Sequence, residues 1–100
     1  MNSYRVFVTP AAVKEIKALP GNIRQRVRQA ISELTTQPRP HNSKVLEQDL
    51  TPLEARRQRI ENWRIIYTMS EAEATVDVLG VRKRPPYDYA DLKRLLDQFS

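Results

Sequence analysis

Arginine is the residue type in this sequence best suited to chemistry on a charged substrate. Twelve of the seventeen basic residues are arginines, and three of them, Arg57, Arg59 and Arg64, stand within eight positions of one another. A guanidinium group is planar, permanently charged and presents a fork of N–H donors that matches the oxygens of a phosphate. This cluster therefore indicates a pocket for closely spaced phosphates.

The strand pattern around these arginines predicts that they share one face of a sheet. Two strand-like runs, 56–60 and 63–69, are separated by a turn of two residues. In that register Arg59 lies opposite Arg64, and Arg57 points to the same side because residues two apart on a strand share a face. The alternate positions of the second run then form the apolar face: Trp63, Ile65, Tyr67 and Met69.

A structural interpretation of the same arginines stands beside the functional one. Like charges placed opposite each other across strands cost stability. The long side chains could simply extend into water, or Asp77, which is predicted on the same face, could pair with one of them.

A second basic segment follows the last predicted strand. Arg82, Lys83 and Arg84 run directly into two prolines, and Tyr87 and Tyr89 come next. Cations can hold a nucleic-acid backbone while a phenol ring stacks on an unpaired base. The alternative is a solvated basic triplet followed by a stiff connection between two elements.

Composition limits the classes of protein that fit. One hundred residues, 1–100, predict a single domain. The formal charge of +5 favours polyanionic partners, above all nucleic acid. A solvated surface with a few extra cations would explain the charge equally well. With no cysteine and a single histidine, His41, in a predicted loop, we expect no metal site and no cofactor.

Neither a membrane span nor a signal peptide is predicted. No apolar run approaches the 18 or so residues that cross a bilayer, and the first residues lack an apolar signal region. We expect a soluble cytoplasmic domain without a membrane partner.

The first half of the chain predicts a strand and a helical hairpin. The run 4–8 is β-branched and aromatic, and Thr9 followed by Pro10 is a typical helix start. A second helix is expected after Gly21-Asn22. Its apolar residues form one stripe: Ile23, Val27, Ala30, Ile31 and Leu34.

The second half predicts an antiparallel meander and a last helix. Residues 35–52 read as a loop with a short strand at 44–46. A third strand, 74–81, would pair Met69 with Ala74 across its turn, which adds Val76 and Val78 to the apolar face. Asp88 can cap a helix with one apolar side: Leu92, Leu95, Leu96 and Phe99. The prediction is an α+β fold of order β-α-α-β-β-β-α.

The order of elements and several local motifs resemble the RelE/ParE superfamily of toxin–antitoxin toxins, in particular its RelE-like branch. The segment 57–67 is similar to the family's basic strand pair, which reads basic-x-basic-apolar, turn, aromatic-Arg-aliphatic-aliphatic-Tyr. The segments 78–84 and 89–92 look like its closing strand and C-terminal part, and Leu19-Pro20 with the basic helix that follows is similar to its helical hairpin. The resemblance covers nearly the whole chain.

The resemblance implies a ribosome-dependent endoribonuclease, or mRNA interferase, that cuts mRNA in the decoding site and so inhibits translation. In the implied reaction a ribose 2′-OH attacks its own 3′ phosphodiester and leaves a 2′,3′-cyclic phosphate. That step needs a base, charge on the non-bridging oxygens and an acid for the leaving 5′ oxygen, and it needs no metal.

The resemblance also implies roles for individual residues. By position, Arg57, Arg59, Arg64 and Arg84 match the family's basic catalytic residues, and Tyr89 matches a tyrosine that stacks on the substrate base. The remaining basic and aromatic positions, Lys83, Arg82 and Tyr87, are predicted to bind substrate, and Tyr87 could replace Tyr89.

One departure from the family pattern concerns proton transfer. Arg57 and Arg59 stand where some members have lysines, and a guanidinium is a poor proton acceptor. The base could be Lys83, Glu61, Glu47, water, or an arginine that shares its proton in the transition state.

The implied partners are a cognate RelB-like antitoxin, the ribosome and mRNA, with operator DNA bound only through the antitoxin. Two alternatives remain open at this stage. One is a ParE-like inhibitor of DNA gyrase without nuclease activity, and the other is a non-catalytic basic module that binds RNA or the ribosome.

Overall fold

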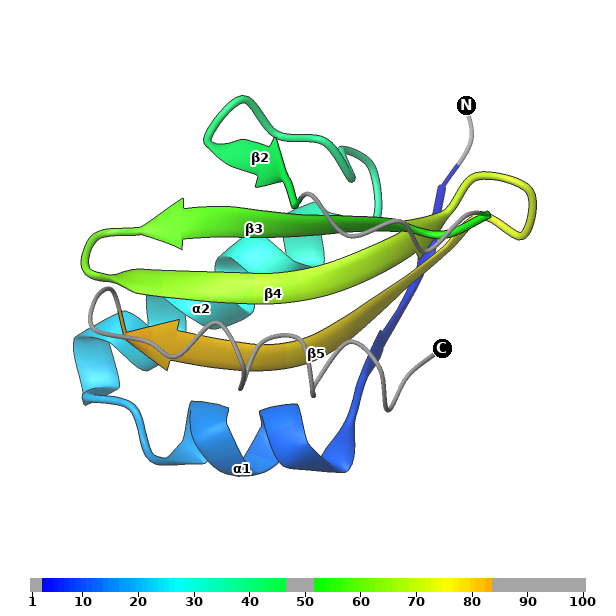
Figure 1. The fold of residues 1–100 in the computed structure, drawn as a ribbon. Coiled ribbons are helices and arrows are strands. Elements are labelled where there is room, and N and C mark those ends of the chain that lie inside the picture. Colours follow the sequence, from blue (N-terminus) through cyan, green and yellow to red (C-terminus); the bar gives the residue numbers. More distant parts are fainter. Residues whose placement is uncertain (1–2, 47–51, 84–100) are drawn as a thin grey trace.

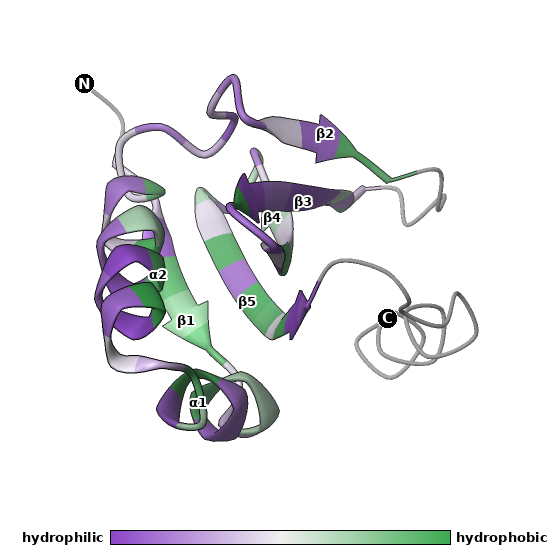
Figure 2. Cartoon of the chain, turned by 90° about the vertical axis from the view of Figure 1, so that its left-hand side faces the viewer, coloured by the Kyte–Doolittle hydropathy of each residue, from purple (hydrophilic) through white to green (hydrophobic). Residues whose placement is uncertain are grey.

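Two helices cover one side of a five-stranded sheet whose strand order is β1-β5-β4-β3-β2 (Figures 1 and 2). The computed structural model describes residues 3–46 and 52–83. Its elements, in chain order, are β1 (Arg5–Val8), α1 (Pro10–Lys17), α2 (Gly21–Glu33), β2 (Ser43–Val45), β3 (Glu54–Ile60), β4 (Trp63–Ser70) and β5 (Thr75–Lys83). The predicted α+β fold is confirmed. The predicted last helix, from Asp88 through Phe99, lies outside the described residues.

The helical hairpin forms as its capping residues predict, with one difference at the second helix. The Thr9 side chain accepts a hydrogen bond from the Ala12 N–H, and Pro10 occupies the first turn of α1. We expected α2 to begin after Asn22, but it begins at Gly21. The reason is that the carbonyl of Pro20, whose backbone is extended, already accepts the Arg24 N–H at 2.8 Å. Neither helix, nor any other among the described residues, is long and apolar enough to cross a membrane.

The core lies between α2, α1 and the helix-facing side of the sheet. The predicted stripe of α2 is buried and belongs to one cluster with the apolar side of β4 and β5. Its members on β4 and β5 are Ile65, Tyr67, Met69, Val76, Val78 and Val81, and Ile60 of β3 joins them. The green, hydrophobic parts of α2 face the sheet in Figure 2, and burial of this stripe is what attaches the helix to it.

The register between β3 and β4 is as predicted, whereas that between β4 and β5 differs. Arg59 lies opposite Arg64 and Arg57 opposite Ile66. Met69 pairs with Val76, not with Ala74, because residues 71–74 form a longer turn. A shift of two residues preserves the side to which each residue points, so Val76 and Val78 still face the core.

A β-bulge interrupts the pairing of β4 with β5. Unlike the two-residue shift at the turn, it changes the side of the sheet to which the later residues of β5 point. Tyr67 pairs with Val78, but the preceding residue, Ile66, pairs with Gly80, so Leu79 is an extra residue in β5. One extra residue reverses the side to which all later residues of the strand point. As a result Arg82 lies opposite Arg64, and Lys83 takes the other side, opposite Trp63.

Ion pairs fix the long loop that precedes β2. The Arg39 guanidinium forms two hydrogen bonds to the Glu54 carboxylate, at 3.1 and 3.2 Å, and an ion pair with Glu71 at 2.6 Å. The Arg39 hydrogen bond holds the pKa of Glu54 below its usual value, with a further contribution from Arg56. The hydrogen bonds to Glu54 and Glu71 raise the pKa of Arg39 further above its ordinary value.

A buried arginine completes this anchor. Arg56 points to the helix side of the sheet, donates to Ser43 Oγ at 3.0 Å and pairs with Glu54 at 2.7 Å. The Ser43 hydroxyl in turn donates to the Pro40 carbonyl at 2.6 Å. Loop residues 38–43 are thereby held against β3 and β4.

At Ala74 the turn requires a backbone conformation that is unfavourable for alanine. Its φ of 54° lies in the left-handed region, which a Cβ atom disfavours. We expect Ala74→Gly to raise the free energy of unfolding by about 0.5–1 kcal/mol, or roughly 2–6 °C in Tm by thermal denaturation. Ala72→Gly, in the same turn, is the matched control because Ala72 is not in that region. A lower Tm for Ala74→Gly than for Ala72→Gly would contradict the assignment.

The anchor of the loop predicts a pH-dependent stability. Glu54→Gln should lower the free energy of unfolding by about 2 kcal/mol at pH 7, since Arg39 and the largely buried Arg56 both lose a carboxylate. The pKa of Glu54 is lowered by folding, so its contribution is complete above the usual carboxyl pKa of about 4.3 and is lost as the pH falls through its lower folded value. Wild type and variant should therefore converge at low pH in denaturant titrations.

The control for that experiment is Glu33→Gln, whose carboxylate has no ion-pair partner among the described residues. It should change stability little at any pH. A difference between wild type and Glu54→Gln that is the same at pH 3 and pH 7 would disprove the anchor.

Candidate nucleic-acid interface

Three arginines form a row across three neighbouring strands, on the side of the sheet away from the helices. Arg59 of β3 lies opposite Arg64 of β4, which lies opposite Arg82 of β5. Strands are spaced about 4.8 Å apart, so the three backbone positions span only about 10 Å. We call this the arginine row.

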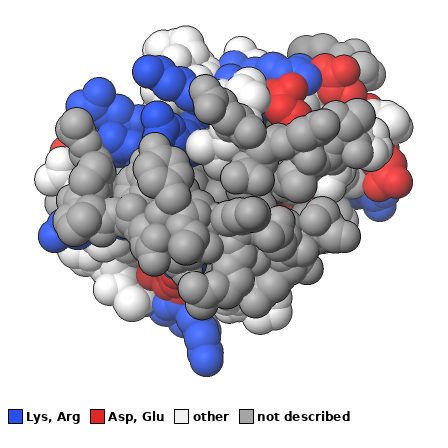
Figure 3. All heavy atoms as spheres, viewed as in Figure 1, with Lys and Arg blue, Asp and Glu red and all other residues white. Residues whose placement is uncertain are grey.

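The arginine row is extended along the sheet by two more cations. Arg57 stands two residues before Arg59 on β3, and Lys44 of β2 lies directly opposite Arg57, so both point to the same side. Basic side chains gather at the upper left of Figure 3, toward the end where β3 turns into β4. The arginine row and these two residues together form a basic face on the sheet.

Arg64 stabilises the β3–β4 turn and also contributes its charge to the arginine row. It is only 8% exposed, and its Nη1 donates to the carbonyls of Glu61 and Trp63 at 3.0 and 2.9 Å. These bonds brace the β3–β4 turn, in which Glu61 has a φ of 53°. Arg59, by contrast, is exposed.

Arg82 is oriented by an acidic residue of α1. Glu15 forms an ion pair with the Arg82 guanidinium, and its other oxygen accepts the Val81 backbone N–H at 3.0 Å. Arg57, Arg64 and Arg82 are all engaged in interactions within the protein. These three members of the basic face are thus held in place by the protein itself.

The other predicted site residues are placed differently. Lys83 is exposed but, because of the bulge, it shares the side of Trp63 rather than that of the arginine row. Glu61 lies in the turn and pairs with Arg26 of α2 at 2.8 Å. Arg84, Tyr87, Tyr89 and Glu47 lie outside the described residues, so their predicted roles stay predictions.

Asp77, the carboxylate that could have neutralised this face, has a shifted pKa. It lies on the same side as the arginine row, opposite Thr68. Burial raises its pKa, and the nearby Glu73 carboxylate raises it further. Pairing with an arginine would act in the opposite direction.

Two members of the basic face were not found from the sequence in this arrangement. Arg82 was predicted to bind substrate as part of the basic segment 82–84 but not as a member of this row, and Lys44 was given no role at the site. Leu79 gives no signal of a bulge, since it is one more apolar residue in an apolar strand. The sequence likewise does not predict the register of β2. This strand is only three residues long and is marked only by the nearby Pro40 and Pro52.

A metal-binding cluster is not seen within residues 3–46 and 52–83. In these ranges no three His, Asp or Glu side chains come together in a way that could hold a metal ion.

Comparison with solved structures defines the class of protein. The chain matches the RelE–RelB complex of the archaeon Pyrococcus horikoshii OT3 with a TM-score of 0.76 and 24% identity, over 85% of this chain and 99% of that one. The RelBE2 toxin–antitoxin complex of Mycobacterium tuberculosis matches with a TM-score of 0.69 and 25% identity, over 82% and 99%. The isolated RelE toxin of E. coli matches with a TM-score of 0.64 and 18% identity, over 98% and 100%. The fold is that of RelE-like toxins.

A comparison of the sequence with family models is more specific. Residues 6–85 match the model described as the ParE toxin of the type II toxin–antitoxin system parDE. The chain therefore belongs to the ParE toxin family, within the RelE/ParE superfamily that its motifs resemble. No curated protein matches it in sequence.

Proposed function

We propose that this toxin is a ribosome-dependent endoribonuclease that cleaves mRNA in the decoding site and so stops translation. The observation that carries the proposal is the arginine row, in which Arg59, Arg64 and Arg82 occupy directly opposed positions on three strands. Like charges in such a row cost stability, which is accounted for if they are arranged to face the oxygens of a polyanion.

The proposed reaction is an intramolecular phosphoryl transfer. The ribose 2′ oxygen attacks its own 3′ phosphorus, and the bond from 2′ oxygen to phosphorus forms as the bond from phosphorus to the 5′ oxygen breaks. The 2′-OH gives up a proton and the leaving 5′ oxygen takes one, so the products are a 2′,3′-cyclic phosphate and a 5′-OH. Guanidinium groups that hold the non-bridging oxygens stabilise the charge that builds up on them.

The basic face also suits the proposed docking on the ribosome. Ribosomal RNA is a polyanion, and contact with it would depend on salt because each neutralised phosphate releases counterions. The net formal charge of the whole chain, +5, also favours its encounter with a polyanion.

A protein antitoxin is the second proposed partner. Solved structures similar to this chain include a RelE–RelB complex and a RelBE2 complex. A partner that covers the basic face would keep the toxin inactive until it is released.

A second candidate function is inhibition of DNA gyrase without nuclease activity. The observation that favours it is the match of residues 6–85 to the ParE toxin model. It leaves the arginine row without an assigned task, which is why we place mRNA cleavage first.

A map of RNA ends in expressing cells separates the two candidates. Under tightly controlled expression, primer extension should show mRNA cuts in phase with codons, and only in messages that are being translated. Intact mRNA together with gyrase-linked DNA breaks would reject cleavage in favour of gyrase inhibition. If both RNA and DNA stay intact, neither candidate holds.

At the level of residues, Arg59→Ala is the sharper variant, because Arg64 also braces a turn. Loss of one charge that stabilises the transition state should lower cleavage on purified ribosomes by about 10²-fold. Arg28→Ala removes another exposed arginine, from α2 on the other side of the sheet, and should leave the rate within a few-fold. Equal effects of the two variants would show that net charge matters and the arginine row does not.

A further inference from the structure

The later part of β5 has a helix as its neighbour on one edge. β1 pairs with β5 only as far as Val8, which lies opposite Val78. Beyond that point α1 packs against β5, and in Figure 1 it lies below the last half of the strand. Side chains of α1 are therefore the groups available to the backbone of β5 on this edge, and shielded backbone N–H and C=O groups need such partners.

The bulge at Leu79 determines which backbone groups face α1. Before the bulge, the Val78 carbonyl faces this edge and accepts the Thr9 N–H at 3.0 Å. The extra residue reverses the alternation, so the Leu79 carbonyl and the Val81 N–H face the same edge after it. The bulge that brings Arg82 into the arginine row thus also turns new backbone groups toward the helix.

Two polar side chains at α1 bind these groups. The hydroxyl of Thr9, the N-cap residue, donates to the Leu79 carbonyl at 3.4 Å. One carboxylate oxygen of Glu15 accepts the Val81 N–H at 3.0 Å, and the other forms the ion pair with the Arg82 guanidinium. Glu15 therefore holds the backbone beside Arg82 and the end of its side chain at the same time.

Glu15 is itself fixed in position. Ala12 and Leu19 stand three residues before and four residues after it, so all three share one face of α1, and both neighbours are buried. The side chains of Glu15 and Arg82 are only 28% and 21% exposed. Salt screens a partly buried pair much less than an exposed one, so the carboxylate is a stable point from which Arg82 is oriented.

We propose that Glu15 is a positioning residue, which keeps the Arg82 guanidinium where it can hold a phosphate oxygen together with Arg59 and Arg64. Glu15 does not touch the substrate and acts through Arg82. A guanidinium has five N–H donors, so pairing with a carboxylate does not prevent it from binding a phosphate. The effect of Glu15 on the reaction rate rests on the proposed function, whereas its effect on Arg82 rests on the geometry alone.

The effect on Arg82 is measured by NMR of the full chain labelled with ¹⁵N. Glu15→Gln is the sharpest variant, because a carboxamide has one acceptor oxygen and can serve Val81 or Arg82 but not both. The heteronuclear NOE of the Arg82 Nε–H should resemble that of the ordered backbone in wild type and fall by more than half in the variant. An equally ordered Arg82 in both proteins would overturn the proposal, whatever the toxin acts on.

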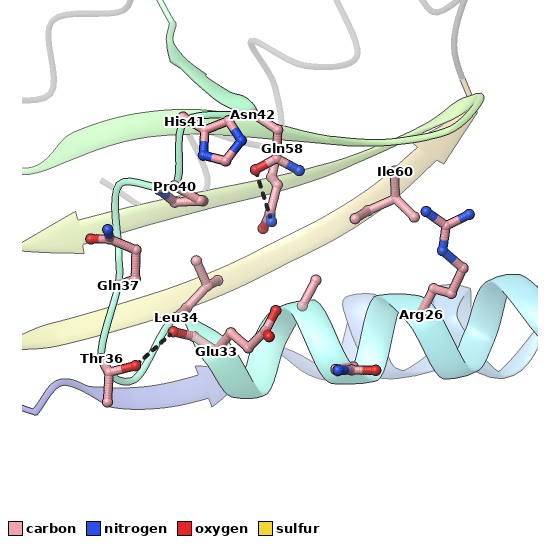
Figure 4. Close-up of a pocket in the computed structure, with 12 residues that line it drawn as sticks. Arg26, Glu33, Leu34, Thr36, Gln37, Pro40, His41, Asn42, Gln58 and Ile60 are labelled. Carbon is pink, nitrogen blue, oxygen red and sulfur yellow. Dashed lines mark hydrogen bonds between the residues drawn. The ribbon is translucent and has the colours of Figure 1, made fainter.

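The matched control is Glu33→Gln, which removes one carboxylate from an exposed position of α2. In Figure 4 Glu33 lies beside a separate groove, between α2 and the loop 36–42. This variant changes the net charge by the same amount, and it should leave the Arg82 signal unchanged. A fall as large as that of Glu15→Gln would assign the effect to charge and reject the proposal.

The effect on the reaction is measured on purified ribosomes. Glu15→Gln and Glu15→Asp should each lower kcat about tenfold with little change in KM, because orientation of a charge is lost and the charge is not. Glu15→Asp is informative because it keeps the negative charge but is one methylene shorter. Unchanged or higher kcat in both variants, with tighter binding in Glu15→Gln only, would show that Glu15 merely competes with the substrate, and would overturn the proposal.

A double-mutant cycle separates a role through Arg82 from support of the fold in general. In an Arg82→Ala background, Glu15→Gln should lower kcat no further, since the group that it positions is absent. A further tenfold loss in that background would show that Glu15 does not act through Arg82. If wild type cleaves no mRNA, the proposed function fails, and the NMR measurement still decides whether Glu15 positions Arg82.

Discussion

Successive side chains on a strand must point to opposite sides of the sheet, and this alternation divides the molecule. On β4, Ile65 and Tyr67 are committed to the helix side and fill the core, so Arg64 can only take the other side. The same rule places Arg57 and Arg59 of β3 beside it. The basic face is therefore a geometric consequence of building a hydrophobic core on the first side, with the bulge at Leu79 as the one addition that brings Arg82 into line.

That arrangement concentrates positive charge, and the surrounding structure compensates for it locally. Glu15 binds Arg82 from α1, and Arg64 is held by two backbone carbonyls of the turn. Neither compensation removes the charge of the arginines. On the helix side the arginines are paired with carboxylates instead. Glu54 pairs with both Arg39 and Arg56, and Glu71 also pairs with Arg39, so those two arginines hold a loop in place and do not face a ligand.

Much of this could be predicted from the sequence because it depends on local rules. The cap at Thr9, the stripe of α2 and the register of a hairpin with a two-residue turn each follow from a few neighbouring residues, and all are confirmed. What could not be predicted depends on contacts between distant segments. The bulge at Leu79, the position of Lys44 opposite Arg57 and the ion pair of Glu15 with Arg82 arise only when α1, β2, β3, β4 and β5 lie together. The assignment of Lys83 beside Arg84 as part of one basic cluster took no account of that bulge, which turns Lys83 to the side of Trp63.

The short first strand leaves the end of β5 without a neighbouring strand on that side. β1 pairs only with Thr75–Val78, so β5 continues past it with a border that could recruit a strand from a second molecule. Glu15 occupies that border, where its carboxylate accepts the Val81 N–H that an added strand would need. The helix that follows β1 thus protects the sheet against edge-to-edge aggregation. A charged side chain in that position excludes an incoming backbone more effectively than an apolar one would, since pairing there would require a carboxylate to give up both its partners.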